Sequence, residues 1–161
     1  MRSRRPEEIA RQAALCAQSG HKEIVLTGIN LGCYGQEYGL TLADAVSAAQ
    51  AEGIARIRLS SLEPEMLTER EIERLRAVET LCPHFHVSLQ SGCDKTLHDM
   101  HRRYDAALFA QTADRLREAF PNCALTTDIM VGFPGETDED FAQSMGFIER
   151  TGFAKLHVFP Y

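Results

Sequence analysis

Five short β-rich runs alternate with helical patterns along the chain, and this alternation restricts the fold more than any other feature. The first residues of successive runs are 33, 28, 40 and 31 positions apart. Spacing near thirty residues is typical of a strand that reaches the next parallel strand through a helix. The expected strands span 23–30, 56–63, 84–91, 124–132 and 155–161. About five such units predict an α/β fold with a parallel sheet, arranged as a complete or partial (β/α) TIM-like barrel.

Capping and stop residues mark the helices between these strands. Six apolar-periodic segments are expected to begin near Pro6, Thr41, Thr68, Asp94, Asp105 and Thr137. Gly20, Gly53 and Gly152 are suited to end the first, second and last of these helices. Thr68 and Glu71 have the spacing of a capping box, in which each side chain accepts a hydrogen bond from the other residue's backbone N–H.

Composition and charge exclude several classes of protein. The 161 residues are 44% hydrophobic and 25% charged, as in an ordinary globular domain. The net charge of -6 argues against a broad nucleic-acid-binding face on this segment. No apolar run approaches the roughly 20 residues that a membrane-spanning helix needs. The basic cluster at Arg2, Arg4 and Arg5 has no apolar segment behind it, unlike a signal peptide.

The five cysteines are odd in number and irregularly spaced. The sequence contains neither C-x-x-C nor C-x-x-x-C-x-x-C. This pattern argues against a disulfide framework and predicts a reducing compartment, which we take to be the cytoplasm. Cys16 and Cys123 are expected to be small core residues.

The segment DIMVGFPGETD at 128–138 is the most informative local sequence. An apolar strand runs into Gly132, and Pro134-Gly135 favours a type II turn. Thr137, with Asp140 three residues later, is placed to cap the next helix. We therefore expect a bare strand end that faces a helix N-terminus, where a flat ring or an anion can approach the backbone.

Three further features lie where expected strands end or where the chain turns polar. The segment 30–39 is rich in glycine but is neither G-x-G-x-x-G nor a P-loop, so it is either a flexible connection or a site of close backbone approach. Arg102 is either a solvated helix end or a bidentate partner for a carboxylate. Asp128 lies in an apolar strand, where it is either a structural ion pair or a contact for a ligand's hydroxyl or amine.

The histidines allow a different interpretation. His84 and His86 share a strand face, His98 and His101 are one helical turn apart, and Cys93 lies between the pairs. A zinc site can be drawn from these residues, although their spacing does not match the usual zinc patterns. The interpretation we favour is that the strand histidines line a polar barrel interior, and no metal ligand is assigned.

Several segments together resemble one family, the radical S-adenosylmethionine (SAM) tRNA methylthiotransferases, also called the MiaB-like family. The segments are HFHVSLQSG at 84–92, MHRRY at 100–104, TDIMVGFPGET at 127–137 and LHVFPY at 156–161. Within this family, LTGINLGCYG at 26–35 and LSSLEP at 59–64 resemble the branch that acts on threonylcarbamoyladenosine in tRNA. The resemblance covers nearly the whole chain.

The resemblance implies a fold, cofactors and a reaction. The fold is the partial TIM-like barrel of radical SAM enzymes. A [4Fe–4S] cluster cleaves SAM to a 5′-deoxyadenosyl radical, and a second cluster takes part in sulfur transfer. The enzyme inserts sulfur at C2 of the modified adenosine beside the tRNA anticodon and methylates it.

This sequence departs from the family pattern because the C-x-x-x-C-x-x-C ligands of the radical-generating cluster are missing. We therefore expect 1–161 to be a fragment of one radical SAM core domain, with Met1 as an introduced start. The N-terminal cluster domain, the cluster-binding segment and the C-terminal RNA-binding domain are then absent. Alone, the fragment is expected to bind no cluster, to be inactive, and to self-associate through exposed sheet edges.

The resemblance also implies a SAM site. The cofactor-binding residues that it assigns are Asn30, Gln90, Ser91, Arg102, Asp128, Val131, Gly132 and Phe133. Arg102 is assigned to the SAM carboxylate, Asn30 to the methionine amino group, and 131–133 to the stretch where adenine packs. Ser60 and Glu63 are further candidates for the pocket wall. No catalytic side chain is assigned in this chain.

Two rival functions remain at this point. A metal-dependent (β/α) barrel hydrolase would use the histidines and would contain stoichiometric zinc. A non-catalytic nucleotide-binding module would use the barrel mouth without redox chemistry. A cysteine triad encoded upstream would exclude the second rival.

Overall fold

The structure is a computed structural model that describes residues 2–161. Its strands are β1 (Glu23–Leu26), β2 (Arg56–Leu59), β3 (His84–His86), β4 (Ala124–Val131) and β5 (Lys155–Pro160). Its α-helices are α1 (Pro6–Gln18), α2 (Leu42–Ala48), α3 (Glu69–Arg76), α4 (Asp94–Asp99), α5 (Ala106–Ala119) and α6 (Asp138–Thr151). Short 3-10 turns are η1 (Leu31–Cys33), η2 (Gln36–Tyr38) and η3 (Pro64–Met66). Every strand begins at the residue that the sequence predicts.

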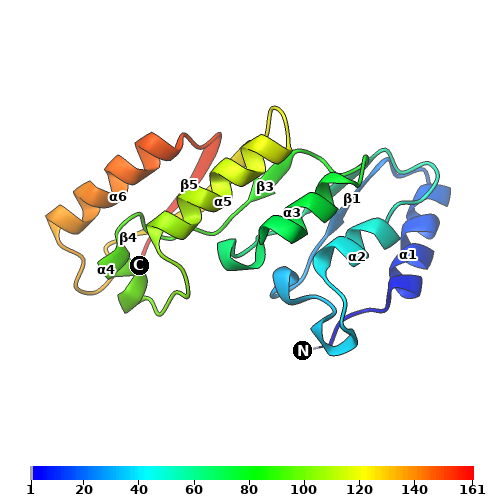
Figure 1. The fold of residues 1–161 in the computed structure, drawn as a ribbon, viewed down its shortest axis with the longest axis horizontal. Helices are drawn as coiled ribbons and strands as arrows, with labels where there is room; N and C mark the ends of the chain where they lie inside the picture. Colours follow the sequence, from blue (N-terminus) through cyan, green and yellow to red (C-terminus); the bar gives the residue numbers. More distant parts are fainter. Residues whose placement is uncertain (1) are drawn as a thin grey trace.

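All strand pairings are parallel, and the strands lie in sequence order. β1 pairs with β2, and β3, β4 and β5 form a second ladder. Isolated parallel bridges, Ile57 with Leu81 and Leu62 with Val87, connect the two ladders. The backbone N–H of Leu62 donates to the carbonyl of His86 at 2.9 Å. The predicted α/β architecture of a partial barrel is thereby confirmed (Figure 1).

The helices cover one face of this sheet and leave the other face open (Figure 1). Side chains on the helix-covered face form the core, because successive strand residues point to opposite sides. Ile57, Phe85 and Leu125 are examples, each at most 2% exposed. The opposite face carries Arg58, His84, His86, Asp128 and His157, and we call this set the polar face.

Most of the predicted caps form, with one exception. The Thr137 hydroxyl accepts from the N–H of Asp140, whose carboxylate accepts from the N–H of Thr137. Of the two hydrogen bonds predicted for the capping box of Thr68 and Glu71, one forms and the other does not. The Thr68 hydroxyl accepts from the N–H of Glu71, but the Glu71 carboxylate accepts instead from the N–H of Ala43 at 2.6 Å.

The strands are shorter than predicted, most of all β1, β2 and β3. β1 ends at Leu26, and the segment 30–39 is held in two 3-10 turns rather than as a flexible loop. Tyr34 fixes this segment, since its buried hydroxyl donates to the carbonyl of Arg4 at 2.7 Å. β3 ends at His86, and an isolated bridge follows at Gln90, whose φ of 68° interrupts the extended backbone.

Candidate functional site

The carboxyl end of β4 has the predicted turn. The N–H of Glu136 donates to the carbonyl of Phe133 at 2.9 Å, and Gly135 has φ +85°, as the third position of a type II turn requires. Gly132 has φ +73°, and a Cβ placed there would meet nothing within 4 Å. Within the chain, the Glu136 carboxylate accepts from the N–H of Gly132 at 2.6 Å. This N–H therefore already faces an anion.

Gln90 and Ser91 lie beside this strand end. The N–H of Gln90 donates to the carbonyl of Asp128 at 2.8 Å, and the carbonyl of Gln90 accepts from the N–H of Met130 at 2.9 Å. Ser91 is fully buried, and its hydroxyl accepts from the N–H of Cys93 at 3.2 Å. Gln90 and Ser91, which follow β3, thus lie beside the second half of β4, between Asp128 and the segment 131–133.

Arg102 forms an ion pair that the sequence did not predict. Its guanidinium lies 3.5 Å from the carboxylate of Glu63, and both side chains are about one-third exposed. Burial raises the pKa of Glu63, while Arg102 opposes that shift. The buried Tyr104 has a pKa raised well above its usual range by desolvation. Arg102 and Glu63 therefore present opposite charges side by side in partly desolvated surroundings.

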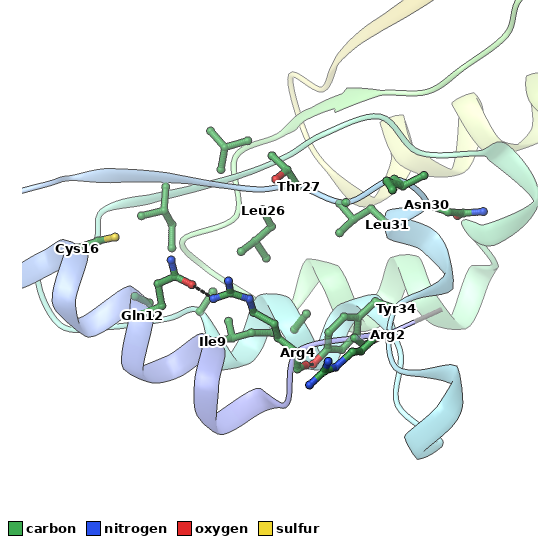
Figure 2. A pocket seen from close by; sticks show the side chains of 18 residues that line it. Arg2, Arg4, Ile9, Gln12, Cys16, Leu26, Thr27, Asn30, Leu31 and Tyr34 are labelled. Carbon is green, nitrogen blue, oxygen red and sulfur yellow. Dashed lines mark hydrogen bonds between the residues drawn. The ribbon is translucent and has the colours of Figure 1, made fainter.

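Asn30 lies apart from these residues, in a cleft beside β1. The cleft has a volume of about 800 Å³ and is lined by α1, β1 and the residues that follow β1. Figure 2 shows Thr27 and Asn30 on one side of it, with Gln12 and Arg4 across from them. Arg4 and Gln12 are hydrogen-bonded to each other. The cleft is partly apolar, because Ile9, Leu26 and Leu31 contribute to its wall.

Asp128 lines a second cleft, on the polar face. This cleft has a volume of about 470 Å³. Its wall is formed by Arg58, Leu59, Ser60, Ser61, His84, His86, Thr126, Asp128, Lys155 and His157. These residues come from β2, β3, β4 and β5 and from the two serines that follow β2. The prediction that His84 and His86 line a polar interior is thus confirmed.

Asp128 is held between two imidazoles. One carboxylate oxygen lies 3.2 Å from Nε2 of His86, and the other lies 3.2 Å from Nδ1 of His157. Nδ1 of His86 lies 3.0 Å from the Thr126 hydroxyl, and the two rings stack with centroids 5.5 Å apart. One ligand atom from each of His86, Asp128 and His157 falls within 4.8 Å of the others, so the three could hold a divalent cation.

The zinc site that the sequence suggested is not formed, because its candidate ligands do not lie together. His98 and His101 are exposed on and after α4, away from the strand histidines. Cys93 is buried, with its sulfur 3.5 Å from the Asp140 carboxylate. Cys16 and Cys123 are partly buried against the core, as predicted, and burial raises the pKa of Cys123 to about 11. Among residues 2–161, no grouping of cysteines with metal-ligand geometry is present.

The eight predicted cofactor residues fall into three places. Asn30 lines the cleft beside β1, Asp128 lines the cleft on the polar face, and Arg102 pairs with Glu63. The other five residues lie in the segment after β3 and at the end of β4, outside both clefts. The structure therefore brings Gln90, Ser91, Asp128 and 131–133 close together, but it does not gather all eight around one cavity.

Sequence comparison decides the family. The profile described as the radical SAM superfamily matches residues 1–148, more than nine-tenths of the chain. This chain belongs to the radical SAM superfamily. The ends of β3 and β4 and the Arg102–Glu63 pair lie within the part of the chain that this family profile matches.

The most similar curated proteins include tRNA methylthiotransferases. The chain is 42% identical to the threonylcarbamoyladenosine tRNA methylthiotransferase MtaB of Bacillus subtilis, over 100% of this chain and 36% of that protein. It is 37% identical to the tRNA-2-methylthio-N(6)-dimethylallyladenosine synthase of a Thermoanaerobacter species, over 99% of this chain and 35% of that protein. The chain thus spans about a third of the length of these relatives.

A solved structure supports the fold independently. Coproporphyrinogen III oxidase (HemN) from Escherichia coli, a radical SAM enzyme, superposes with a TM-score of 0.72 over 97% of this chain and 35% of that chain. The sequence identity is 19%, so this likeness concerns the fold alone.

Sequence analysis missed three ionisable residues of the cleft on the polar face. Arg58, Lys155 and His157 were not singled out, yet all three line it. The signal was available in the alternation of strand residues. Arg58 in β2, and Lys155 and His157 in β5, have the strand parity that places them on the same face as Asp128.

Proposed function

We propose that the protein is a radical SAM tRNA methylthiotransferase that inserts sulfur and a methyl group at C2 of threonylcarbamoyladenosine beside the anticodon. The observation that carries this proposal is the 42% identity over the whole of this chain to a relative named for that nucleoside. The partner is then tRNA, and the compartment is the cytoplasm. In the described part of the chain, no helix is long and apolar enough to cross a membrane.

The residues at the strand ends fit SAM chemically. The methionine part of SAM carries an ammonium and a carboxylate on one carbon, and Glu63 and Arg102 offer the complementary charges 3.5 Å apart. Gly132 leaves open space where a side chain would stand, so a flat adenine ring can approach the backbone of 131–133. Gln90 and Ser91 would complete this site as hydrogen-bonding residues, whereas Asn30 and Asp128 line the two separate clefts. When bound with its cluster, SAM supplies one-electron chemistry.

The residues of this chain do not fit a [4Fe–4S] cluster, which needs thiolates that converge. All five cysteines lie among the described residues, and they form no such group. We propose that the chain is one part of the radical SAM core. The cluster-binding segment, an N-terminal cluster domain and a C-terminal RNA-binding domain would belong to the rest of the protein. The relatives support this, since they are almost three times as long as the part that matches.

Iron and sulfide analysis tests where the cluster ligands lie. The 161-residue chain and the full-length protein would each be reconstituted anaerobically and examined by visible absorption. A cluster in the full-length protein alone supports the proposal, and a stoichiometric cluster in the short chain contradicts it.

Nucleoside analysis of cellular tRNA tests the reaction. In a strain that lacks the gene, threonylcarbamoyladenosine should persist without its methylthio form, and the full-length gene should restore that form. Unchanged methylthiolation of threonylcarbamoyladenosine in the deletion strain, with no other enzyme present to supply it, would contradict the proposed reaction. The two rival functions, a barrel hydrolase and a non-catalytic binding module, gain no support from the family membership.

A further inference from the structure

The cleft on the polar face contains positive charge that no carboxylate neutralises. Among residues 2–161, neither Arg58 nor Lys155 lies within 4.0 Å of a carboxylate. Asp128 is the single carboxylate on the cleft wall, and both of its oxygens already contact His86 and His157. The cleft therefore retains two cations able to bind an anion.

Arg58 is held in place by a neighbouring imidazole. Nη2 of Arg58 lies 3.2 Å from Nδ1 of His84. The guanidinium can donate to this ring nitrogen, which holds one side of Arg58 against the sheet. An arginine fixed on one side has fewer conformations to lose when its remaining N–H groups bind a ligand.

The cleft also contains an unsatisfied hydroxyl. Oγ of Ser60 is buried and has no hydrogen-bond partner among the described residues. Buried polar groups nearly always have partners, so an orphaned hydroxyl on a cleft wall favours a polar ligand there. Leu59 is the single apolar residue of the wall, and a hydrocarbon group would gain little from this cleft.

The two nucleosides named in the relatives differ in this chemistry. Threonylcarbamoyladenosine contains an amino acid joined through its nitrogen, so its N6 substituent ends in a free carboxylate and bears a hydroxyl. Dimethylallyladenosine carries a hydrocarbon at the same nitrogen. Building on the proposed function, we propose that Arg58 and Lys155 bind the substituent's carboxylate and that Ser60 binds its hydroxyl. This cleft then selects the amino-acid-modified nucleoside over the prenylated one.

The test compares four ligands on the purified full-length protein by isothermal titration calorimetry. They are threonylcarbamoyladenosine as the free nucleoside, its methyl ester, N6-dimethylallyladenosine and adenosine 5′-phosphate. The ester keeps the shape and the hydroxyl but removes the charge. The free acid should bind about tenfold or more tightly than the ester and the prenylated nucleoside, as expected for a charge-assisted hydrogen bond.

Arg58→Gln should abolish the preference for the acid over the ester. It should leave the affinity for the ester within about twofold of the wild-type value. Lys155→Gln should reduce the preference for the acid. Arg56→Gln is the matched control, because Arg56 lies on the same strand and face but pairs with Glu23 at 2.7 Å. It should keep the wild-type preference. If the wild-type protein binds the acid and the ester with equal affinity, or binds neither, the proposal is overturned. The proposal is also overturned if the protein binds adenosine 5′-phosphate through Arg58 but does not prefer the free acid to the ester. The two cations would then be assigned to RNA phosphates.

This result is separable from the proposed function. A protein that converts threonylcarbamoyladenosine in tRNA but shows no Arg58-dependent preference refutes the cleft assignment alone. A protein with that preference that never forms the methylthio product refutes the proposed reaction alone.

Discussion

The carboxylate of Glu71 on α3 accepts a hydrogen bond from the backbone N–H of Ala43 on α2 at 2.6 Å. Glu71 is buried, and Ala43 lies in the first turn of its helix, where the backbone N–H groups have no partner inside the helix. A single side chain thus joins two neighbouring βα units at a helix N-terminus, where the helix dipole also favours a negative charge.

Replacing Glu71 should destabilise the fold. Glu71→Ala leaves a buried N–H without an acceptor and should lower the free energy of unfolding by about 1–3 kcal/mol. Glu71→Gln retains an acceptor oxygen and should cost less. Urea denaturation of the purified protein measures both. The exposed neighbour provides the control, since Glu73→Gln should change the stability by less than about 0.5 kcal/mol. Equal losses for Glu71→Ala and Glu73→Gln would refute this role.

Two glycines near α6 should respond oppositely to alanine. At Gly92, a Cβ would lie 2.7 Å from Cβ of Phe147 and 2.8 Å from the carbonyl oxygen of Ser144, so Gly92→Ala should cost about 1–3 kcal/mol. At Gly146, inside the helix, the nearest atom is the flexible Arg150 guanidinium at 3.2 Å. Gly146→Ala should therefore stabilise the protein by about 0.5–1 kcal/mol. Thermal unfolding of both variants checks the signs, and a tolerated Gly92→Ala would contradict this close packing.

Acid stability should depend on Asp140. The hydrogen bond from Lys95, followed by that from the backbone of Thr137, holds the pKa of this carboxyl well below its ordinary value of 3.8. Because the folded pKa is the lower one, the stabilisation is complete above about pH 4 and is lost as the pH falls toward the folded pKa. Asp140→Asn should reduce stability at pH 7 and flatten the loss below about pH 4. The exposed Asp138→Asn is the control, and matching acid profiles for wild type and Asp140→Asn would refute the assignment.

The isolated 161-residue chain should self-associate through its sheet edges. Among the described residues, β1 pairs with β2 alone and β5 pairs with β4 alone, and Val25 and Val158 on these edges are 53% and 59% exposed. Unpaired strand edges invite pairing with another chain, and lysine on an edge opposes it. Sedimentation should show dimers or larger species, reduced by Val158→Lys or Val25→Lys. Leu15→Lys on α1, equally exposed in the wild type, should not reduce them, and a monomer at high concentration would contradict this prediction.

The fold could be predicted from local signals because each strand and helix start is encoded by neighbouring residues. Strand ends were less predictable, since they depend on how far a neighbouring strand continues. The segment 84–91 illustrates this, because its sequence is strand-like throughout, yet β3 ends at His86 and the φ of 68° at Gln90 departs from extended backbone. The role of Glu71 was missed for a similar reason. Its partner, Ala43, is distant in sequence, and Glu71 has the spacing of a local capping box.

The candidate site was only partly predictable. Motif positions identified Gln90, Arg102, Asp128 and the turn after β4, because each stands beside an unusual local sequence. The Arg102–Glu63 pair and the Asp128 contacts with His157 join side chains from different βα units, so no local pattern indicates them. Arg58 was overlooked because a single arginine in a short strand has no distinguishing context until its face of the sheet is known.

The most direct test of the central claim is an in vitro conversion. The full-length protein, reconstituted anaerobically and supplied with SAM, a reductant and a sulfur source, would be incubated with tRNA that carries threonylcarbamoyladenosine or dimethylallyladenosine. Mass spectrometry of the digested nucleosides should detect SAM-dependent methylthio-threonylcarbamoyladenosine and leave the dimethylallyl nucleoside unchanged. Conversion of the dimethylallyl nucleoside alone, or of neither by an enzyme with intact clusters, would contradict the account.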